Sequence, residues 1–282
     1  MSKRPSLTRQ VECALKEKLA IGESKHLAKQ IGEVNEKIYS WETFRSYLKH
    51  CIYFVQYCKE ERSCRTLDEC KPYVTEWLAT RANLSPYTQK LELSALSKLY
   101  GEKFEIKLKK CERTHITRSR GTAKRDSNFS EENNRTLIAF CKSSGLRRAE
   151  VSALRVEDVL FQADGEVYID VHRATKGGRE RFIKLFSDEN EIKLIKDHLR
   201  GKAPNEKVFA RINSNLDIHS YRAEYCQRVY KAYERDLSAL PERELYRCRK
   251  DKHGVVYDRW AMSKASHALG HSRISVIAGH YL

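Results

Sequence analysis

The chain has 282 residues, of which 40% are hydrophobic and 33% are charged, a composition typical of a globular protein and unlike that of a disordered one. No stretch approaches the roughly 20 apolar residues that a membrane-spanning helix requires, and the N-terminus has no apolar run that would predict a secretory signal. The net charge of +16 favours a polyanionic partner, and without a basic amphipathic helix or lipid anchor it indicates nucleic acid rather than a membrane surface.

The nine cysteines are odd in number, and none form a closely spaced CxxC pair. In a chain without an export signal they are expected to be reduced thiols, several of them buried. Cys58, Cys64 and Cys70 lack the short paired spacing of a zinc site. The sequence therefore predicts no metal and no cofactor.

The first hundred or so residues are predicted to form a compact helical bundle. Over residues 43–58, apolar side chains recur every three or four positions, as on the buried face of an amphipathic helix. Ser85 and Pro86 are typical of an N-cap and the first turn of another helix. Further helices are expected over residues 7–19 and 67–80. Together these elements predict a helical domain over residues 1–110.

Residues 107–125 carry eight Lys or Arg, one Glu and very few apolar side chains. Such a run does not pack as a core element, so residues 111–126 are predicted to be a basic linker. The linker could be a solvated tether, but given the overall charge we favour a segment that lies along a phosphate backbone. Its expected DNA contacts are Arg118, Arg120, Lys124 and Arg125.

A second domain is predicted over residues 127–282. It begins with a helix that Ser130 caps and Gly145 ends, followed by a short helix over residues 148–154. The three strand-like runs that follow are separated by turns and predict a small antiparallel sheet; they are residues 158–162, 166–172 and 179–186. The remainder is expected to be helical, apart from a polar stretch at 236–258. The predicted fold class is mainly α with a small antiparallel β-sheet.

Short motifs follow one another through this second domain. In order, they are Gly145-Leu146-Arg147-Arg148-Ala149-Glu150, Lys176 in a turn, His219-Ser220-Tyr221-Arg222, Leu269-Gly270-His271 and Tyr281. Each alone is common by chance, whereas their order and spacing together are specific. They resemble the catalytic motifs of the tyrosine recombinase (phage integrase) family, and the chain looks closest to integrases of mobile genetic elements. The resemblance implies a core DNA-binding domain over 1–110 and a catalytic domain over 127–282.

The residue types suit phosphodiester cleavage, which places negative charge on the non-bridging oxygens of the phosphate. Guanidinium groups bind such oxygens bidentately and stay charged, so Arg147 and Arg222 are the candidate clamp. His219, one helical turn before Arg222, could donate to the phosphate or assist the nucleophile's proton. Lys176, at a hairpin turn, could protonate the leaving 5′-oxygen. Tyr281 would be the nucleophile.

Two further assignments come from the resemblance, and two alternatives stay open. By resemblance, His271 supplies another phosphate donor and Glu150 braces the active site. The family's motif has its arginine directly after Gly-Leu, which favours Arg147. The alternatives are Arg148 for Arg147 and Arg179 for Lys176.

The resemblance implies a site-specific DNA recombinase or integrase that forms a 3′-phosphotyrosine intermediate and passes through a Holliday junction. The expected partner is double-stranded DNA, bound by a homotetramer on paired sites in the bacterial cytoplasm. One alternative is a type IB topoisomerase-like DNA relaxase, which shares this chemistry. The other is a DNA-binding regulator that keeps the fold without catalysis.

The sequence departs from the family's usual pattern near its catalytic tyrosine. His271 and Tyr281 are ten residues apart, one more than usual. Because one residue turns a helical side chain by about 100°, a break or bulge is expected between them, with Gly279 as the candidate position. Residues 236–258 are predicted to be an insertion over the DNA or at a subunit contact. Without DNA, residues 270–282 are expected to lie away from the other site residues.

Overall fold

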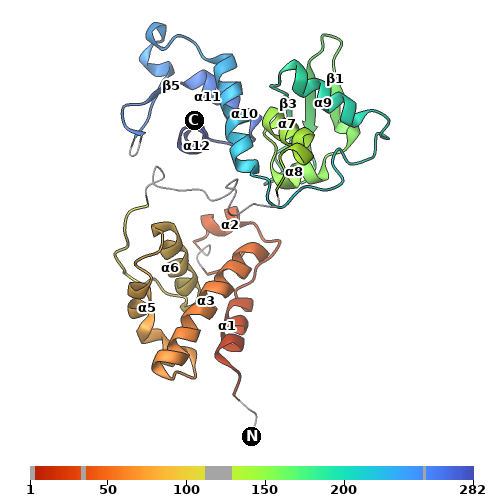
Figure 1. Cartoon of the computed structure of the whole chain (residues 1–282). Helices are drawn as coiled ribbons and strands as arrows, with labels where there is room; N and C mark the ends of the chain where they lie inside the picture. The colour runs from red at the N-terminus through yellow and green to blue at the C-terminus, as the bar shows by residue number, and fades with distance from the viewer. Residues whose placement is uncertain (1–3, 33–35, 112–128, 250–251) are drawn as a thin grey trace. The chain divides into compact units, whose positions relative to one another are not determined.

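The computed structural model describes residues 4–32, 36–111, 129–249 and 252–282, and the chain divides into two units, Met1–Cys111 and Glu112–Leu282 (Figure 1). The fold is mainly α with small antiparallel sheets, which confirms the predicted fold class. Within the described ranges, none of the helices is both long and apolar enough to span a membrane. The linker residues expected to contact DNA lie outside the described residues; they are Arg118, Arg120, Lys124 and Arg125.

The first unit is a helical bundle. Its helices are α1 (Leu7–Lys16), α2 (Lys25–Gln30), α3 (Trp41–Arg62), α4 (Leu67–Cys70), α5 (Val74–Thr80) and α6 (Pro86–Tyr100). The long helix α3 packs against α1 and α6. The apolar spacing that predicted α3 is confirmed, because Phe44, Cys51 and Phe54 on that face are buried. Phe54 meets Trp77 of α5 edge-on, with ring centroids 5.4 Å apart.

The ends of these helices follow local chemistry. The Ser85 hydroxyl accepts a hydrogen bond from the Thr88 amide at 3.2 Å, and Pro86 occupies the first turn of α6, as predicted. The helix expected over 67–80 is divided at Pro72, which lies in a 3₁₀ turn between α4 and α5 because proline has no amide hydrogen to donate. The short helix α2 was not predicted; its Leu27 is exposed, so the segment lacks an apolar stripe that packs inward.

The second unit begins with two helices, a sheet and a further helix. These elements are α7 (Arg135–Ser144), α8 (Arg148–Ala153), β1 (Val159–Phe161), β2 (Val167–Val171), β3 (Arg181–Lys184) and α9 (Glu189–Leu199). The strands form an antiparallel sheet in the order β1-β2-β3, which confirms the predicted hairpins. Ile169 of β2 pairs with Val159 and Ile183, and all three side chains are buried in one core with residues of α7 and α9.

The rest of the second unit surrounds a separate core. Its elements are α10 (Ile218–Tyr233), β4 (Leu245–Arg247), β5 (Val256–Asp258), α11 (Arg259–Ala268) and α12 (Ser275–His280). Helices α10, α11 and α12 bury Val229, Met262 and Ile277 among them. This core joins the helix that carries the HxxR motif to the segment that ends at Tyr281.

The polar stretch at 236–258 contains an antiparallel hairpin, β4–β5, that was not predicted. Its base is tied to the end of α10 by Arg235, which donates to Asp258 at 2.8 and 2.7 Å and to Glu244 at 2.6 Å. Asp258 is buried, and the hydrogen bonds from Arg235 are the largest of the effects that lower the pKa of its carboxyl to about 2. The described residues at both ends of this stretch therefore pack as part of the second unit.

Candidate active site

Gly145 ends α7 and starts the turn that presents Arg147. Its φ of +58° lies in the left-handed region, and a Cβ there would come within 2.3 Å of the Tyr225 ring carbon Cδ1. Tyr225 is fully buried and has no room to withdraw, so the turn requires glycine. Two residues later Arg147 is the N-cap residue of α8, and its amide donates to the Glu150 carboxylate at 2.7 Å.

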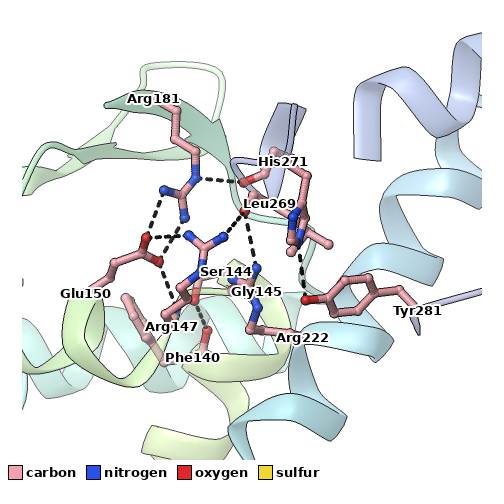
Figure 2. A network of polar contacts seen from close by, with 11 residues as sticks. Phe140, Ser144, Gly145, Arg147, Glu150, Arg181, Arg222, Leu269, His271 and Tyr281 are labelled. Atoms are coloured by element: carbon pink, nitrogen blue, oxygen red, sulfur yellow. Dashed lines mark hydrogen bonds and ion pairs between the residues drawn. The ribbon is translucent and has the colours of Figure 1, made fainter. Parts of the chain in front are cut away.

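Glu150 is buried and receives two arginines (Figure 2). Arg147 Nη1 donates to its Oε1 at 2.9 Å, and Arg181 donates to both carboxylate oxygens at 3.0 and 2.9 Å. Burial alone would raise the pKa of Glu150, but the bonds from Arg181 and Arg147 outweigh it and hold that pKa below its ordinary value. Glu150 therefore stays ionised and fixes the position of Arg147.

Arg147 and Arg222 converge on one backbone oxygen at the end of α11. The Nη2 atom of each donates to the Leu269 carbonyl at 3.2 Å, and Arg222 Nη1 also donates to the Gly145 carbonyl (Figure 2). Arg222 is only 2% exposed. Burial lowers the pKa of its guanidinium, and Arg147 adds to this effect, whereas the Tyr281 phenol opposes it. The two cations are thus held side by side by backbone carbonyls.

Tyr281 lies beside Arg222. After α11 the chain reverses at Gly270, whose φ is +67°, and α12 packs back through Ile277. Tyr281 follows α12 in a non-helical conformation and is 9% exposed. Its hydroxyl lies 3.3 Å from His271 Nε2, and its ring centroid lies 5.8 Å from Cζ of Arg222.

Two expectations about this segment are wrong. Residues 270–282 were expected to lie away from the rest of the site without DNA, but α12 is packed on α10 and α11, and Tyr281 lies beside His271. The break was expected at Gly279, which instead lies inside α12. The chain turns at Gly270, before α12, and α12 ends at His280, immediately before Tyr281. The direction of the Tyr281 side chain therefore depends on both of these points.

His271 is held by the backbone and surrounded by positive charge. Its amide donates to the Ser266 carbonyl at 2.9 Å, and the Ser266 hydroxyl donates back to the His271 carbonyl at 3.3 Å. Burial, followed by the charges of Arg222 and Arg147, lowers the pKa of His271 to about 4. The imidazole is therefore neutral at neutral pH.

Lys176 and His219 complete the set of candidate catalytic residues. Lys176 is exposed in the turn between β2 and β3, and His219 is exposed in the first turn of α10. A cavity of about 740 Å³ is lined by residues that include all the candidate catalytic side chains: Arg147, Lys176, His219, Arg222, His271 and Tyr281. Glu150 lies beneath it as the partner of Arg147. The structure thus brings the six together.

The two alternatives also border the cavity, but they differ in their surroundings. Arg148 donates to the carbonyls of Asn213 at 2.8 Å, Ser214 at 3.2 Å and Leu216 at 2.7 Å, so its guanidinium ties α8 to the loop before α10. Arg179 is exposed in the same loop as Lys176. The hydrogen bonds of Arg148 point to a structural role.

Some residues of the site were not anticipated. Arg181, 6% exposed, carries the bidentate pair to Glu150, and its Nε donates to the Ala268 carbonyl at 2.9 Å. Strand alternation places Arg181 on the same face as the buried Ile183, which could have revealed a buried charge. Gln227 donates to the Tyr281 carbonyl at 3.2 Å, and Lys252 donates to that of Leu282. No sequence pattern marks these last two residues.

Among the residues that the structure describes, no group of His, Cys, Asp and Glu side chains is arranged to hold a metal ion. The lining of the cavity carries six basic side chains: Arg147, Arg148, Lys176, Arg179, Arg222 and Arg273.

Comparison with solved structures identifies the fold. The XerH site-specific recombinase bound to its difH substrate in a pre-cleavage complex has a TM-score of 0.51 and 15% identity, over 98% of this chain and 93% of that one. For XerH on palindromic difH, in a post-cleavage complex, the TM-score is 0.52 with 15% identity, over 98% and 90%. The Tn1549 transposon integrase with circular intermediate DNA gives 0.53 and 12%, over 99% and 95%.

Comparison of the sequence with models of protein families finds no match, and comparison with curated proteins finds none either. The structural likeness nevertheless covers nearly the whole chain, and it extends to recombinases and integrases from separate systems. The chain therefore has the fold of the tyrosine recombinases that its motifs resemble.

Proposed function

We propose that this chain is a site-specific DNA recombinase or integrase that cleaves and rejoins duplex DNA through a phosphotyrosine on Tyr281. The observation that carries the proposal is the cavity in which the Tyr281 phenol meets His271 and Arg222, with Arg147 and Lys176 also in its lining. A phenol beside two arginines and a neutral imidazole suits attack on a phosphodiester.

In this proposal the scissile phosphate binds between Arg147 and Arg222. Both guanidiniums are held by backbone carbonyls and, for Arg147, by Glu150, so they need not reorganise when the substrate arrives. Fixed donors of this kind stabilise the charge that develops on the non-bridging oxygens more than they stabilise the ground state. His219, in the first turn of α10, is placed to donate to the same phosphate.

The bond changes are those of a transesterification. Tyr281 Oη attacks phosphorus while the bond from phosphorus to the 5′-oxygen breaks, which leaves a 3′-phosphotyrosine and a free 5′-hydroxyl. Lys176, exposed in the β2–β3 turn, gives the proton that the leaving 5′-oxygen requires. Because the phosphodiester is exchanged for another phosphate ester, a 5′-hydroxyl can reverse the step without an energy cofactor.

The partner we propose is double-stranded DNA, and a net charge of +16 supports a polyanion. Structures of this fold include a recombinase bound to its difH substrate and an integrase in complex with DNA. We further propose that residues 1–110 are a core DNA-binding domain, 111–126 a basic linker and 127–282 the catalytic domain. The active form would be a homotetramer on paired sites, with a Holliday junction as intermediate, in the bacterial cytoplasm.

A nicked suicide substrate tests the proposal. When cleavage releases a short fragment that diffuses away, the protein stays covalently attached to DNA and migrates as a slower band. We expect this band with the unaltered protein and none with Tyr281→Phe, which should bind DNA equally well. A covalent band with Tyr281→Phe would refute the nucleophile, and no band with the unaltered protein on any site would favour a non-catalytic regulator.

The same assay separates the topoisomerase-like alternative. A recombinase should protect a short inverted repeat from nuclease digestion and become attached at a fixed position within it. Attachment at many positions, together with relaxation of supercoiled plasmids that lack a site, would favour the relaxase instead.

A further inference from the structure

The Tyr281 hydroxyl lies beside the imidazole of His271. His271 Nε2 lies 3.3 Å from that hydroxyl, and the two rings are 5.5 Å apart. His219, exposed in the first turn of α10, also lines this cavity. His271 is therefore within hydrogen-bonding reach of the phenol, as a group that removes its proton must be.

We propose that His271 is the general base that removes the phenolic proton of Tyr281 during cleavage. This role rests on the proposed function and changes the part that the family resemblance gave His271, which was to donate a hydrogen bond to the phosphate. A histidine that accepts from the phenol through Nε2 carries its ring proton on Nδ1, so it cannot donate from Nε2 to a phosphate oxygen in that tautomer.

The charge around His271 keeps it ready to accept a proton. It is neutral because it is partly buried and because basic groups from several elements face it: Arg222 on α10, Arg147 at the start of α8, His280 on α12 and Arg179 in the β2–β3 loop. Only a neutral imidazole can take up the proton of the phenol, and this environment maintains that state at neutral pH.

Because of the same charges, the proton affinity of His271 depends on whether the scissile phosphate is bound. Without a bound anion, Arg147 and Arg222 oppose a positive charge on His271. A phosphate held between the two guanidiniums compensates their charge, so His271 binds a proton more strongly when the scissile phosphate is in place. Arg222, 5.8 Å from the Tyr281 ring, meanwhile favours the developing phenolate.

The protons balance in both directions. In cleavage, the O–H bond of Tyr281 breaks, its proton moves to His271 Nε2, the phenolate oxygen bonds to phosphorus and the departing 5′-oxygen takes a proton from Lys176. In rejoining, the incoming 5′-hydroxyl gives its proton to Lys176, and the released phenolate recovers one from the His271 imidazolium. One complete cycle leaves both groups as they began.

A tyrosine with a more acidic phenol can distinguish whether His271 acts as a general base or as a hydrogen-bond donor to the phosphate. The probe is the full chain with a fluorinated tyrosine incorporated at position 281, in unaltered and His271→Asn forms. The amide side chain of the variant would keep the ability to donate a hydrogen bond but could not accept a proton. The measurement is the single-turnover rate of covalent attachment to a nicked suicide substrate at saturating protein, with DNA affinity and melting temperature as folding controls.

With ordinary tyrosine, His271→Asn should slow attachment by about 10²-fold or more, the usual contribution of a general base. With the fluorinated phenol the loss should shrink to less than about tenfold, because an acidic nucleophile has less need of a base. His219→Asn is the matched control, and its loss should be the same with either phenol. Equal losses for His271→Asn with both phenols would overturn the proposal and leave His271 as a phosphate donor.

The outcome also separates this inference from the proposed function. If the unaltered protein forms no covalent complex on any DNA, the proposed function fails. If it forms one that depends on Tyr281, while the His271→Asn loss is independent of phenol acidity, only the assignment of the base fails.

Discussion

Arg181 and Glu150 form a two-point ion pair in the interior of the second unit, with N–O distances of 3.0 and 2.9 Å and neither residue more than 6% exposed. Glu150 comes from α8 and Arg181 from the start of β3, so the pair joins the helix that carries Arg147 to the strand that follows Lys176. The Arg181 bond to the Ala268 carbonyl adds the end of α11.

Removing Arg181 should therefore damage stability and cleavage together. Arg181→Met leaves Glu150 buried with Arg147 as its remaining arginine, and breaking such a pair costs about 3–5 kcal/mol. We expect a lower melting temperature and a large loss of covalent attachment. The double variant Arg181→Met with Glu150→Gln removes the uncompensated charge, so it should melt above Arg181→Met alone. If the single variant is the more stable, the ion pair is not what holds these elements.

Gly145→Ala should be among the most damaging small substitutions in the chain. The left-handed φ costs an alanine about 1–2 kcal/mol, and the contact with the Tyr225 ring adds about 1–3 kcal/mol of overpacking. Gly165→Ala is the control: its φ is +86° and its Cβ would meet open space, so it should cost the first amount alone. Thermal denaturation of both variants measures the difference, and equal losses would show that the Tyr225 contact is harmless.

Most of the fold could be predicted from the sequence because its long elements have strong local patterns. The apolar stripe of α3 and the alternating strands β2 and β3 bury the residues that those patterns select. Helix α2 and the β4–β5 hairpin could not be found this way. The hairpin strands have three residues each, too few for an alternation to emerge, and ion pairs at Arg235 hold the hairpin's base.

The candidate site shows a similar division. Arg147, Arg222, His271 and Tyr281 could be named because their types, order and spacing form motifs, and the structure places them around one cavity. The contacts among these four side chains could not be predicted from the sequence, because each contact depends on tertiary packing. The direction of the Tyr281 side chain depends on the path of the backbone from Gly270 through α12. The number of residues between His271 and Tyr281 does not by itself predict that path.

Arg147→Ala should mainly slow cleavage, whereas Arg148→Ala should mainly lower stability. In the proposed function Arg147 binds the phosphate, so its loss should reduce the rate of covalent attachment by about 10²–10³-fold, with a smaller effect on DNA affinity. Arg148 donates to three backbone carbonyls, so its loss should lower the melting temperature and slow cleavage far less. Single-turnover rates and melting curves distinguish them. A greater rate loss in Arg148→Ala would reverse the assignment of the phosphate-binding arginine.

His271 should make stability fall in mildly acidic solution. The folded protein holds the pKa of His271 at about 4, below its ordinary 6.5, so between these values the unfolded chain binds more protons. The contribution of His271 to stability is therefore complete above pH 6.5 and is lost as the pH falls toward 4. The melting temperature of His271→Asn should depend less on pH in this window than that of the unaltered protein. Parallel curves would contradict the lowered pKa.

Gln227 and Lys252 should act on cleavage by holding the nucleophile in place. Gln227, on α10, donates to the Tyr281 carbonyl at 3.2 Å, and Lys252, in the segment between β4 and β5, donates to the carbonyl of Leu282. These two hydrogen bonds hold the backbone of Tyr281 and Leu282 in place. A displacement of about 1 Å in a reacting group can reduce the rate by about 10²-fold. The 236–258 region would then serve the active site directly.

We expect Gln227→Ala and Lys252→Ala each to slow covalent attachment by about tenfold or more at saturating DNA, while DNA affinity and melting temperature change little. Lys252→Arg keeps a cationic donor and should recover most of the rate. Lys231→Ala, an exposed lysine of α10, controls for the loss of one positive charge. If Lys252→Ala cleaves as fast as Lys231→Ala, the contact with Leu282 does not position Tyr281, and the packing of Ile277 and Ala278 against α11 is enough to hold it.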